Sequence, residues 1–258
     1  MSGTKSPSPK AQAINTDQSP IEALIVTHGQ PSDPEPAEAI LAKFTAGVQA
    51  DIPDHVIGSA TLAAPGRLEE QLNRLVDGGV IYPLFMADGW FVRTALIKRI
   101  SGASLDTVVA VMPPFGLDAA LPGIVARNIT ETLSDTFGAN TQPSLLVAAH
   151  GSAHGTAPAA SAQLFAERLR KELPGVPIEV GFIEQDPALG DVAAKMTEQT
   201  ICLPFFAMPG EHVRLDIPAA LKQGGFSGPV LPPVSQLDGA DKIIANVLSR
   251  ALNKRQLS

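Results

Sequence analysis

The chain repeats itself, and this internal repeat limits the available folds more than any other feature of the sequence. Three segments of the first half return in the second half, in the same order and at offsets of 122 (from 28 to 150), 121 (from 83 to 204) and 119 (from 111 to 230). The matched pairs are Ala23–Gln30 with Leu145–Ser152, Pro83–Arg93 with Pro204–Arg214, and Val111–Pro114 with Val230–Pro233. Such a nearly constant offset predicts two similar halves that arose by duplication.

Strand and helix patterns alternate within each half. Short apolar runs bounded by Gly or Pro are typical of buried parallel strands, and they are predicted at 23–27, 56–60, 79–87, 107–112, 144–149, 177–183, 200–207 and 229–231. Apolar residues at helical spacing predict helices around Ile40, Leu41, Phe44 and Val48, around Leu68, Leu72 and Leu75, and at 158–173, 187–197, 214–223 and 238–252. This alternation predicts an α/β fold with two similar parallel-sheet halves, helices on both faces of each sheet, and a cleft between them.

The predicted organisation has three parts. Residues 1–20 are rich in Ser, Pro, Lys and Gln and lack the apolar stretch of a signal peptide, so we expect a disordered tail. Residues 21–140 form the first half and residues 141–258 the second. The boundary is placed near 139–143, where Ala-Asn-Thr-Gln-Pro interrupts the pattern.

Composition excludes several classes of protein. Of 258 residues, 45% are apolar and 17% charged, which is typical of a globular chain with a sizeable core. The net charge of −7 provides no basic stripe for nucleic acid, and no apolar run is long enough to span a membrane, so a cytoplasmic location is expected. The single cysteine, Cys202, lies in an apolar run and is expected to be a buried thiol. Because the duplication supplies two halves, both a monomer and a homodimer stay open.

Polar side chains follow the predicted strands at positions that the repeat relates to one another. His28 and His150 follow the first strand of each half, Glu184 follows the second strand of the second half, and His212 lies in the loop after the third. Ligands of open parallel sheets bind beyond the carboxyl ends of the strands. We therefore expect these side chains to converge on one rim of each sheet.

A metal site in the second half is the main functional hypothesis. His150 and His212 supply imidazoles, which suit borderline divalent metals, and Glu184 supplies a carboxylate that is either a further ligand or a proton acceptor. At the matching places the first half has His28, roughly Thr61, and Phe91. A purely structural role gives no reason for this difference between the halves, although drift of one copy is an alternative.

These motifs resemble those of the CbiX-type sirohydrochlorin chelatases, which are class II tetrapyrrole metal chelatases. The resemblance rests on Leu145–Ser152, on Gly181–Glu184 and above all on Gly210–Pro218, which reads Gly-Glu-His-Val-Arg-Leu-Asp-Ile-Pro. It implies the two-half α/β chelatase architecture. It also implies a lyase in which His150 and His212 bind the incoming metal and Glu184 assists. Placement in the second half is closer to anaerobic cobalt chelatases and protoporphyrin ferrochelatases than to many long CbiX-type chains.

The implied reaction is the insertion of Co²⁺ or Fe²⁺, with Ni²⁺ as a further option, into sirohydrochlorin or a related tetrapyrrole, in cobalamin or sirohaem biosynthesis. No cofactor beyond the substrate metal is expected. The partners would then be the tetrapyrrole and a divalent ion, since composition favours neither nucleic acid nor membrane. Imidazole and carboxylate ligands accept all three metals, so the residues leave the metal and the pathway open.

Four residues are candidates for binding the substrate. Ser152 and His154 lie in the loop before a predicted helix start and could hold a carboxylate, with simple helix capping as the alternative for Ser152. Arg214 could pair with a substrate carboxylate or, equally, with Asp216. Met208 would line the cleft. Met86, Trp90 and Phe91 share this prediction, and all four would stack on or bend the tetrapyrrole ring, although core packing is the favoured interpretation for each of them.

Two rival functions remain at this stage. A non-catalytic metal or tetrapyrrole carrier would use the same His/Glu/His set, although a carrier gains little from the proton acceptor Glu184. A hydrolase based on His150 and Ser152 is weakly supported, because no nucleophile elbow or orienting acid accompanies them.

Overall fold

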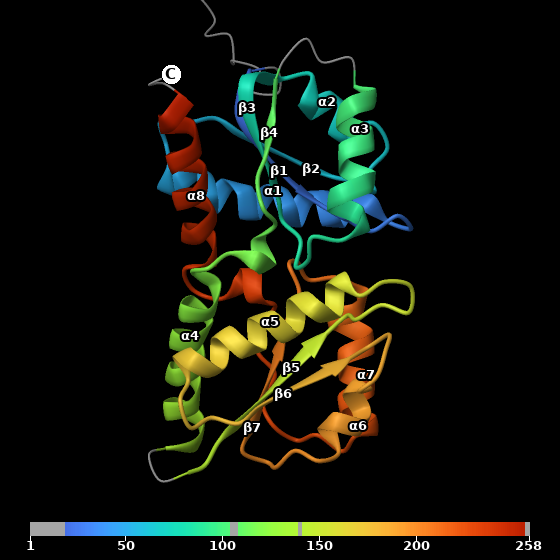
Figure 1. The fold of residues 1–258 in the computed structure, drawn as a ribbon, viewed down its shortest axis with the longest axis vertical. Coiled ribbons are helices and arrows are strands. Elements are labelled where there is room, and N and C mark those ends of the chain that lie inside the picture. The colour runs from blue at the N-terminus through green and yellow to red at the C-terminus, as the bar shows by residue number, and fades with distance from the viewer. Residues whose placement is uncertain (1–18, 104–107, 139–140, 256–258) are drawn as a thin grey trace, which may run out of the picture.

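The computed structural model describes residues 19–103, 108–138 and 141–255 and contains two parallel sheets, one above the other in Figure 1. The first half contains β1 (Ile21–Thr27), α1 (Pro34–Asp51), β2 (Ile57–Thr61), α2 (Arg67–Leu72), β3 (Leu75–Pro83), the π-helix η2 (Phe91–Leu96), α3 (Ile97–Gly102), β4 (Ala110–Val111), the 3₁₀ turn η3 (Phe115–Leu117) and α4 (Leu121–Phe137). The second half contains β5 (Ser144–Ala149), α5 (Ala157–Glu172), β6 (Ile178–Phe182), α6 (Leu189–Ala193), β7 (Thr200–Pro204), the π-helix η4 (His212–Asp216), α7 (Ile217–Gln223), the 3₁₀ turn η5 (Val234–Gln236) and α8 (Ala240–Arg255).

Both sheets are wholly parallel and have the same topology. The first has the order β2-β1-β3-β4 and the second β6-β5-β7. The strand expected at 229–231 is reduced to an isolated bridge between Val230 and Cys202. In each half the first strand is therefore central, so the loop that follows it lies between the loops of its neighbours. The predicted α/β fold with helices on both faces of two parallel sheets is confirmed.

Alternation along the central strands separates the two faces of each sheet. In β1, Ala23 and Ile25 face the main core, while Leu24 and Val26 face a smaller core beneath α2 and α3. The equivalent small core of the second half lies beneath α6 and α7 and contains Cys202, which is fully buried as expected. Because the strands are buried on both faces, their sequences appear as continuous apolar runs.

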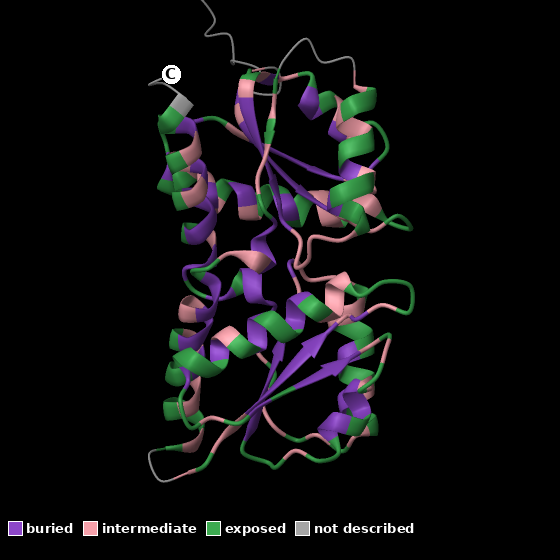
Figure 2. Ribbon diagram, viewed as in Figure 1, coloured by how far each residue is buried: buried purple, intermediate pink, exposed green. Residues whose placement is uncertain are grey.

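The main core is shared by the two halves, because each half places its last helix on the other sheet. In Figure 1 α8 lies beside the upper sheet, where it packs against α1 and β3, and α4 lies beside the lower sheet, where it packs against α5. A division into 21–140 and 141–258 describes the order along the chain but not this exchange. Apolar periodicity predicts that a helix has a buried face, not which sheet covers it. The exchange ties the halves together and fixes how their strand ends face each other. Figure 2 shows the buried residues running through both sheets and across this junction.

One predicted helix boundary is wrong. Leu75 was expected in a helix with Leu68 and Leu72, but the helix ends at Leu72 and Leu75 begins β3. All three side chains face the same core, so helical spacing could not separate them. The expected disordered tail lies outside the described residues except for positions 19 and 20, as does part of the predicted boundary, at 139–140. Among the helices of the described ranges, none is long and apolar enough to cross a membrane.

Candidate functional site

Three strand ends of the second sheet bring together His150, Glu184 and His212. His150 directly follows β5, Glu184 comes two residues after β6, and His212 begins η4 after the loop that follows β7. The Glu184 N–H donates to the His150 carbonyl at 2.9 Å, which continues the β5–β6 pairing and fixes the two side chains next to each other. Possible ligand atoms of the three residues all lie within 4.8 Å of one another.

Gly151 makes the sharp turn after His150 possible. Its φ of +74° lies in the left-handed region, and a Cβ there would come within 2.6 Å of the Gln185 side chain. The turn also brings the Gly151 carbonyl to 3.0 Å from His150 Nδ1. Gly151 thus allows the backbone carbonyl that follows His150 to contact the Nδ1 atom of His150 and orient its ring.

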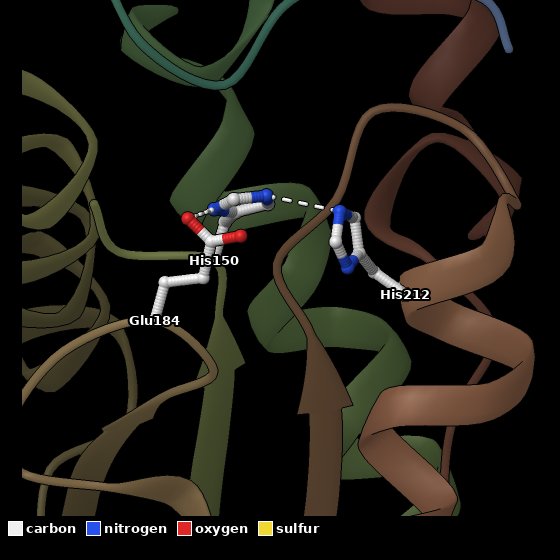
Figure 3. A group of neighbouring side chains, drawn as sticks. All are labelled: His150, Glu184 and His212. Atoms are coloured by element: carbon white, nitrogen blue, oxygen red, sulfur yellow. Dashed lines mark hydrogen bonds and ion pairs between the residues drawn. The ribbon is translucent and has the colours of Figure 1, made fainter. Parts of the chain in front are cut away.

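The two imidazoles point their Nε2 atoms at each other, 3.0 Å apart, with the rings nearly perpendicular (Figure 3). His150 Nδ1 faces the Gly151 carbonyl, and His212 Nδ1 lies 2.7 Å from Asp216 Oδ2. A carbonyl and a carboxylate can only accept, so each Nδ1 carries a proton and each ring turns its Nε2 toward the other. Two ring nitrogens this close need a cation between them, either a shared proton, as in a hydrogen bond, or a metal ion.

This spacing fits a shared metal ion. Metal–imidazole bonds of about 2.0–2.1 Å separate two ligand nitrogens by about 2.8–3.4 Å for bond angles between 90° and tetrahedral. The observed 3.0 Å lies within this range. A second group that holds Nδ1–H is the usual arrangement for metal-binding histidines. The pair is therefore already arranged for a borderline divalent ion.

Glu184 lies on the other side of the His150 ring from His212. Its Oε2 is 3.6 Å from His150 Nδ1, and Figure 3 shows the carboxylate beside that nitrogen and not between the two Nε2 atoms. Both side chains are partly exposed. In this position Glu184 can hold the Nδ1 proton of His150 or accept a proton from a bound molecule. Direct ligation would require its side chain to swing toward Nε2.

Asp216 was not recognised as part of the site from the sequence, where it was treated as a possible ion-pair partner of Arg214. In the structure it pairs with His212 instead. The two residues are four positions apart in a helical segment, and this spacing places side chains on one face. That spacing was the signal available in the sequence.

The four predicted substrate-binding residues lie in different surroundings. Ser152 belongs to the turn after His150: its N–H donates to Gln185 Oε1 and its hydroxyl accepts from the His154 N–H, so it does not cap α5. His154 is exposed and lies outside the group of possible metal ligands. Arg214 is exposed, and its guanidinium makes no ion pair or hydrogen bond with the described part of the chain.

Met208 does not face the histidine pair. It packs against the main core, its sulfur lies 4.0 Å from the Ser235 hydroxyl, and it lines a cavity of about 380 Å³ together with Lys43 and Phe44 of α1. Core packing, the alternative favoured from the sequence, is the better description of this side chain.

The first half keeps the geometry of the site without its ligands. The ring centroids of His28 and Phe91 are 4.3 Å apart at 72°, against 4.4 Å and 81° for His150 and His212. His28 Nδ1 also faces the carbonyl of its following glycine, at 2.8 Å. Phe91 therefore occupies the place of His212, as the repeat predicts.

The expected match between Thr61 and Glu184 is wrong. Thr61 pairs with Thr27 in the strand register, as Phe182 pairs with Ala149, so Thr61 is the counterpart of Phe182. The counterpart of Glu184 is Ala63, whose N–H donates to the His28 carbonyl at 2.9 Å. The strand register is needed to match Ala63 with Glu184, because the sequences around these two residues differ. The counterpart of Asp216, by the offset of 121, is Ala95.

The loops at the strand ends of the two halves meet at two places. Gln30, after β1, donates to Glu211 Oε2 at 2.8 Å, and Glu211 immediately precedes His212. At the second place, a Cβ placed on Gly89 would lie 3.8 Å from the Ala157 Cβ at the start of α5. The loop after the third strand of each half thus meets the loop after the first strand of the other. His28 with Phe91 and His150 with His212 line opposing rims.

Comparison with known proteins agrees with this architecture. The CbiX family model matches residues 22–132 and 144–252. No curated protein matches the chain. A solved structure described as CbiX, the terminal enzyme for biosynthesis of siroheme in denitrifying bacteria, is 40% identical, with a TM-score of 0.79 over 89% of this chain and 99% of that one.

Two more distant structures share the fold. SirB from Bacillus subtilis, solved with Fe³⁺, is 15% identical, with a TM-score of 0.71 over 91% of this chain and 96% of that one. A multi-domain protein from Deinococcus radiodurans, described as structurally similar to chelatases, is 17% identical, with a TM-score of 0.60 over 89% of this chain and 54% of that one. The two-half architecture is therefore found in chains of very different sequence.

Proposed function

The chain belongs to the CbiX family, and from this premise we propose that it inserts a divalent metal ion into a tetrapyrrole. The observation that carries the proposal is the pair of Nε2 atoms that His150 and His212 direct at each other over 3.0 Å. Of the two metals expected first, Co²⁺ and Fe²⁺, the 40% identical relative favours Fe²⁺, because that protein is described as acting in siroheme biosynthesis. The proposed tetrapyrrole is sirohydrochlorin.

In the proposed reaction the metal is a substrate held at the rim of the cleft. Each ring that takes up M²⁺ releases two pyrrole N–H protons, so charge balances and no electron is transferred. Two neutral imidazoles hold the ion without cancelling its charge, and they can be replaced one at a time by ring nitrogens. The partly exposed position of both histidines leaves room for that exchange.

The two carboxylates of the site, Asp216 and Glu184, have different proposed roles. Asp216 holds the Nδ1 proton of His212, which keeps Nε2 free for metal. The Glu184 carboxylate lies 3.6 Å from His150 Nδ1, and it is proposed to accept a proton displaced from the ring. General-base assistance of this kind is typically worth about 10²–10⁴-fold in rate.

Binding of the substrate carboxylates is proposed for Arg214 and the Ser152–His154 turn. The argument for Arg214 comes from the repeat. Its counterpart Arg93 is paired with Asp88 at 2.7 Å, whereas the counterpart of Asp88 is Pro209. Among the described residues, the Arg214 guanidinium thus has no partner, and it lies two residues from His212. Met208 is not included, because it faces the core.

The test is anaerobic absorbance spectroscopy of sirohydrochlorin with Fe²⁺ or Co²⁺, with and without the protein. We expect acceleration that His150→Ala and His212→Ala both abolish, and Glu184→Gln to retain metal binding while slowing insertion. His28→Ala is the matched control for metal binding, because it removes a histidine from the same local backbone in the first half and should leave the affinity unchanged. Pigment or metal binding without acceleration would leave the carrier as the better description.

A further inference from the structure

The cavity of about 380 Å³ that Met208 lines is separate from the histidine pair. Its walls come from α1, from η5 and from the start of α8, and the described residues that line it do not include His150, Glu184 or His212. Sites for small molecules in proteins occupy about 300–1,000 Å³ and combine apolar walls with a few polar groups. The cavity is therefore large enough for a small ligand.

The repeat relates α1, on one side of this cavity, to α5 of the second half. The two helices end in the same way, at Ile52 with φ −134° and ψ 65° and at Leu173 with φ −121° and ψ 64°, which gives an offset of 121 (from 52 to 173). At this offset the buried residues of the two helices coincide: Leu41, Thr45 and Val48 match Ala162, Ala166 and Leu169. The counterpart of Gly47 is then Arg168.

Arg168 fills the place in the second half that corresponds to the cavity. Its Nη1 donates to the Leu117 carbonyl of η3 at 3.2 Å. The offset of 119 that relates η3 to η5 makes Gln236 the counterpart of Leu117, and Gln236 lines the cavity together with Gly47. Gly47 has no side chain, so this position supplies no donor to the Gln236 carbonyl. The cavity thus takes the place of an arginine side chain.

The charges around the cavity favour a cation in that place. A Cβ placed on Gly47 would lie 3.7 Å from Asp241 Oδ2, so this carboxylate lies beside the position where the side chain is missing. Asp238 also lines the cavity. At the offset of 119 the counterparts of Asp238 and Asp241 are the uncharged residues Ala119 and Pro122. The half that lacks the arginine therefore carries two carboxylates that the other half does not have.

The remaining walls suit the rest of a small cationic molecule. Phe44 and Met208 provide apolar surface against which a guanidinium or an aliphatic chain can pack. Lys43 is exposed and lines the cavity, and its ammonium makes no ion pair or hydrogen bond with the described residues. It is available for a carboxylate on the same ligand.

We propose that this cavity binds a small organic cation, whose guanidinium or ammonium group lies where Arg168 lies in the second half. The group donates to the Asp241 carboxylate and to the Gln236 carbonyl. Hydrogen bonds between charged groups are about twice as strong as those between neutral groups, and a guanidinium presents its donors in a planar fork that matches a carboxylate. Free arginine carries this group together with a carboxylate for Lys43. The inference does not depend on the proposed function.

The test is a titration of L-arginine into the metal-free full chain with ¹³C-labelled methionine methyl groups, followed by NMR. Met208 is the methionine that lines the cavity among the described residues, and Met208→Leu identifies its signal. L-citrulline is the matched ligand, because it replaces the guanidinium by a neutral urea group. We expect a saturable shift of the Met208 signal with arginine and a Kd at least about tenfold higher for citrulline.

Gly47→Arg supplies the guanidinium from the chain itself. Gly47 lies inside α1, and the nearest neighbour of a Cβ there, beyond its own helix, is Asp241 Oδ2 at 3.7 Å, so the side chain can be accommodated. We expect Gly47→Arg to abolish arginine binding. Gly47→Ala is the matched control, since it adds a helix-favouring side chain without a cation, and it should keep arginine binding.

Asp241→Asn tests the carboxylate and should raise the Kd for arginine about tenfold. Circular dichroism checks that each variant is folded. The proposal is overturned if arginine does not shift the Met208 signal, if citrulline binds as tightly as arginine, or if both Gly47→Arg and Asp241→Asn leave the Kd unchanged. No metal or tetrapyrrole takes part in these titrations, so a negative result leaves the proposed function untouched.

Discussion

Removal of the Asp216 carboxylate is the substitution that most sharply tests how the site is built. Asp216 Oδ2 lies 2.7 Å from His212 Nδ1, and this hydrogen bond places the proton on Nδ1 and the lone pair on Nε2. In Asp216→Ala the ring is free to rotate and to exchange tautomers, so the fraction of molecules with both Nε2 lone pairs available for metal falls. Loss of such a supporting group typically costs about 10–100-fold in metal affinity.

The local environment places the expected effect at the lower end of that range. The Asp216 side chain is 48% exposed, so water can partly replace the carboxylate as the acceptor for Nδ1–H. We expect the Kd for Co²⁺ to rise about tenfold, equivalent to about 1.4 kcal/mol. Asp216→Asn, which keeps an oxygen acceptor, should lie between Asp216→Ala and the unmodified protein.

The assay is competition of Co²⁺ between the protein and a chelating dye under anaerobic conditions. Asp88→Ala is the matched control, since it removes an ion-paired carboxylate from the corresponding loop of the first half, where Asp88 contacts Arg93. It should leave the metal affinity unchanged. Equal affinities for Asp216→Ala and the unmodified protein would refute the reasoning from tautomers, because orientation of His212 would then not depend on Asp216.

Three further predictions concern other parts of the molecule. Phe91→His combined with Ala63→Glu should rebuild a metal site beside His28 and raise the bound Co²⁺ from one to two ions per chain, as measured by equilibrium dialysis. A ratio that stays at one would show that the two halves do not position these side chains in the same way. Burial raises the pKa of the Cys202 thiol to about 12, so it should react with a disulfide reagent only after unfolding, and fast reaction in the folded protein would contradict its placement. Gly151→Ala places a side chain at φ +74° against Gln185 and should weaken metal binding and lower the melting temperature; unchanged values of both would contradict the tight turn.

Much of the fold follows from the repeat and from apolar patterning. Continuous apolar runs such as Leu145–Ala149 identified central parallel strands, because only strands covered on both faces lack polar alternation. The exchange of α4 and α8 between the sheets could not be predicted, since both helices have an apolar face that would fit either sheet. Leu75 shows a similar limit, because spacing places a side chain on a face without fixing where a helix ends.

For the site, the sequence predicted which residues meet but not all of the contacts between them. The rule that ligands bind at the carboxyl ends of parallel strands predicted that His150, Glu184 and His212 meet at one rim, and the structure brings possible ligand atoms of the three within 4.8 Å of one another. Asp216 was assigned the wrong partner, because sequence spacing allowed both Arg214 and His212. The direction of the Met208 side chain depends on the path of the loop after β7, which residue types alone do not determine.

The account as a whole claims that metal held between His150 and His212 is the metal that enters the ring. The most direct test is a single-turnover experiment in which protein loaded with one equivalent of isotopically labelled Fe²⁺ is mixed with sirohydrochlorin and an excess of unlabelled Fe²⁺. We predict that the first equivalent of product carries the label, and that His212→Ala gives product with the isotope ratio of the solution. Product with the solution ratio from the unmodified protein would contradict the claim.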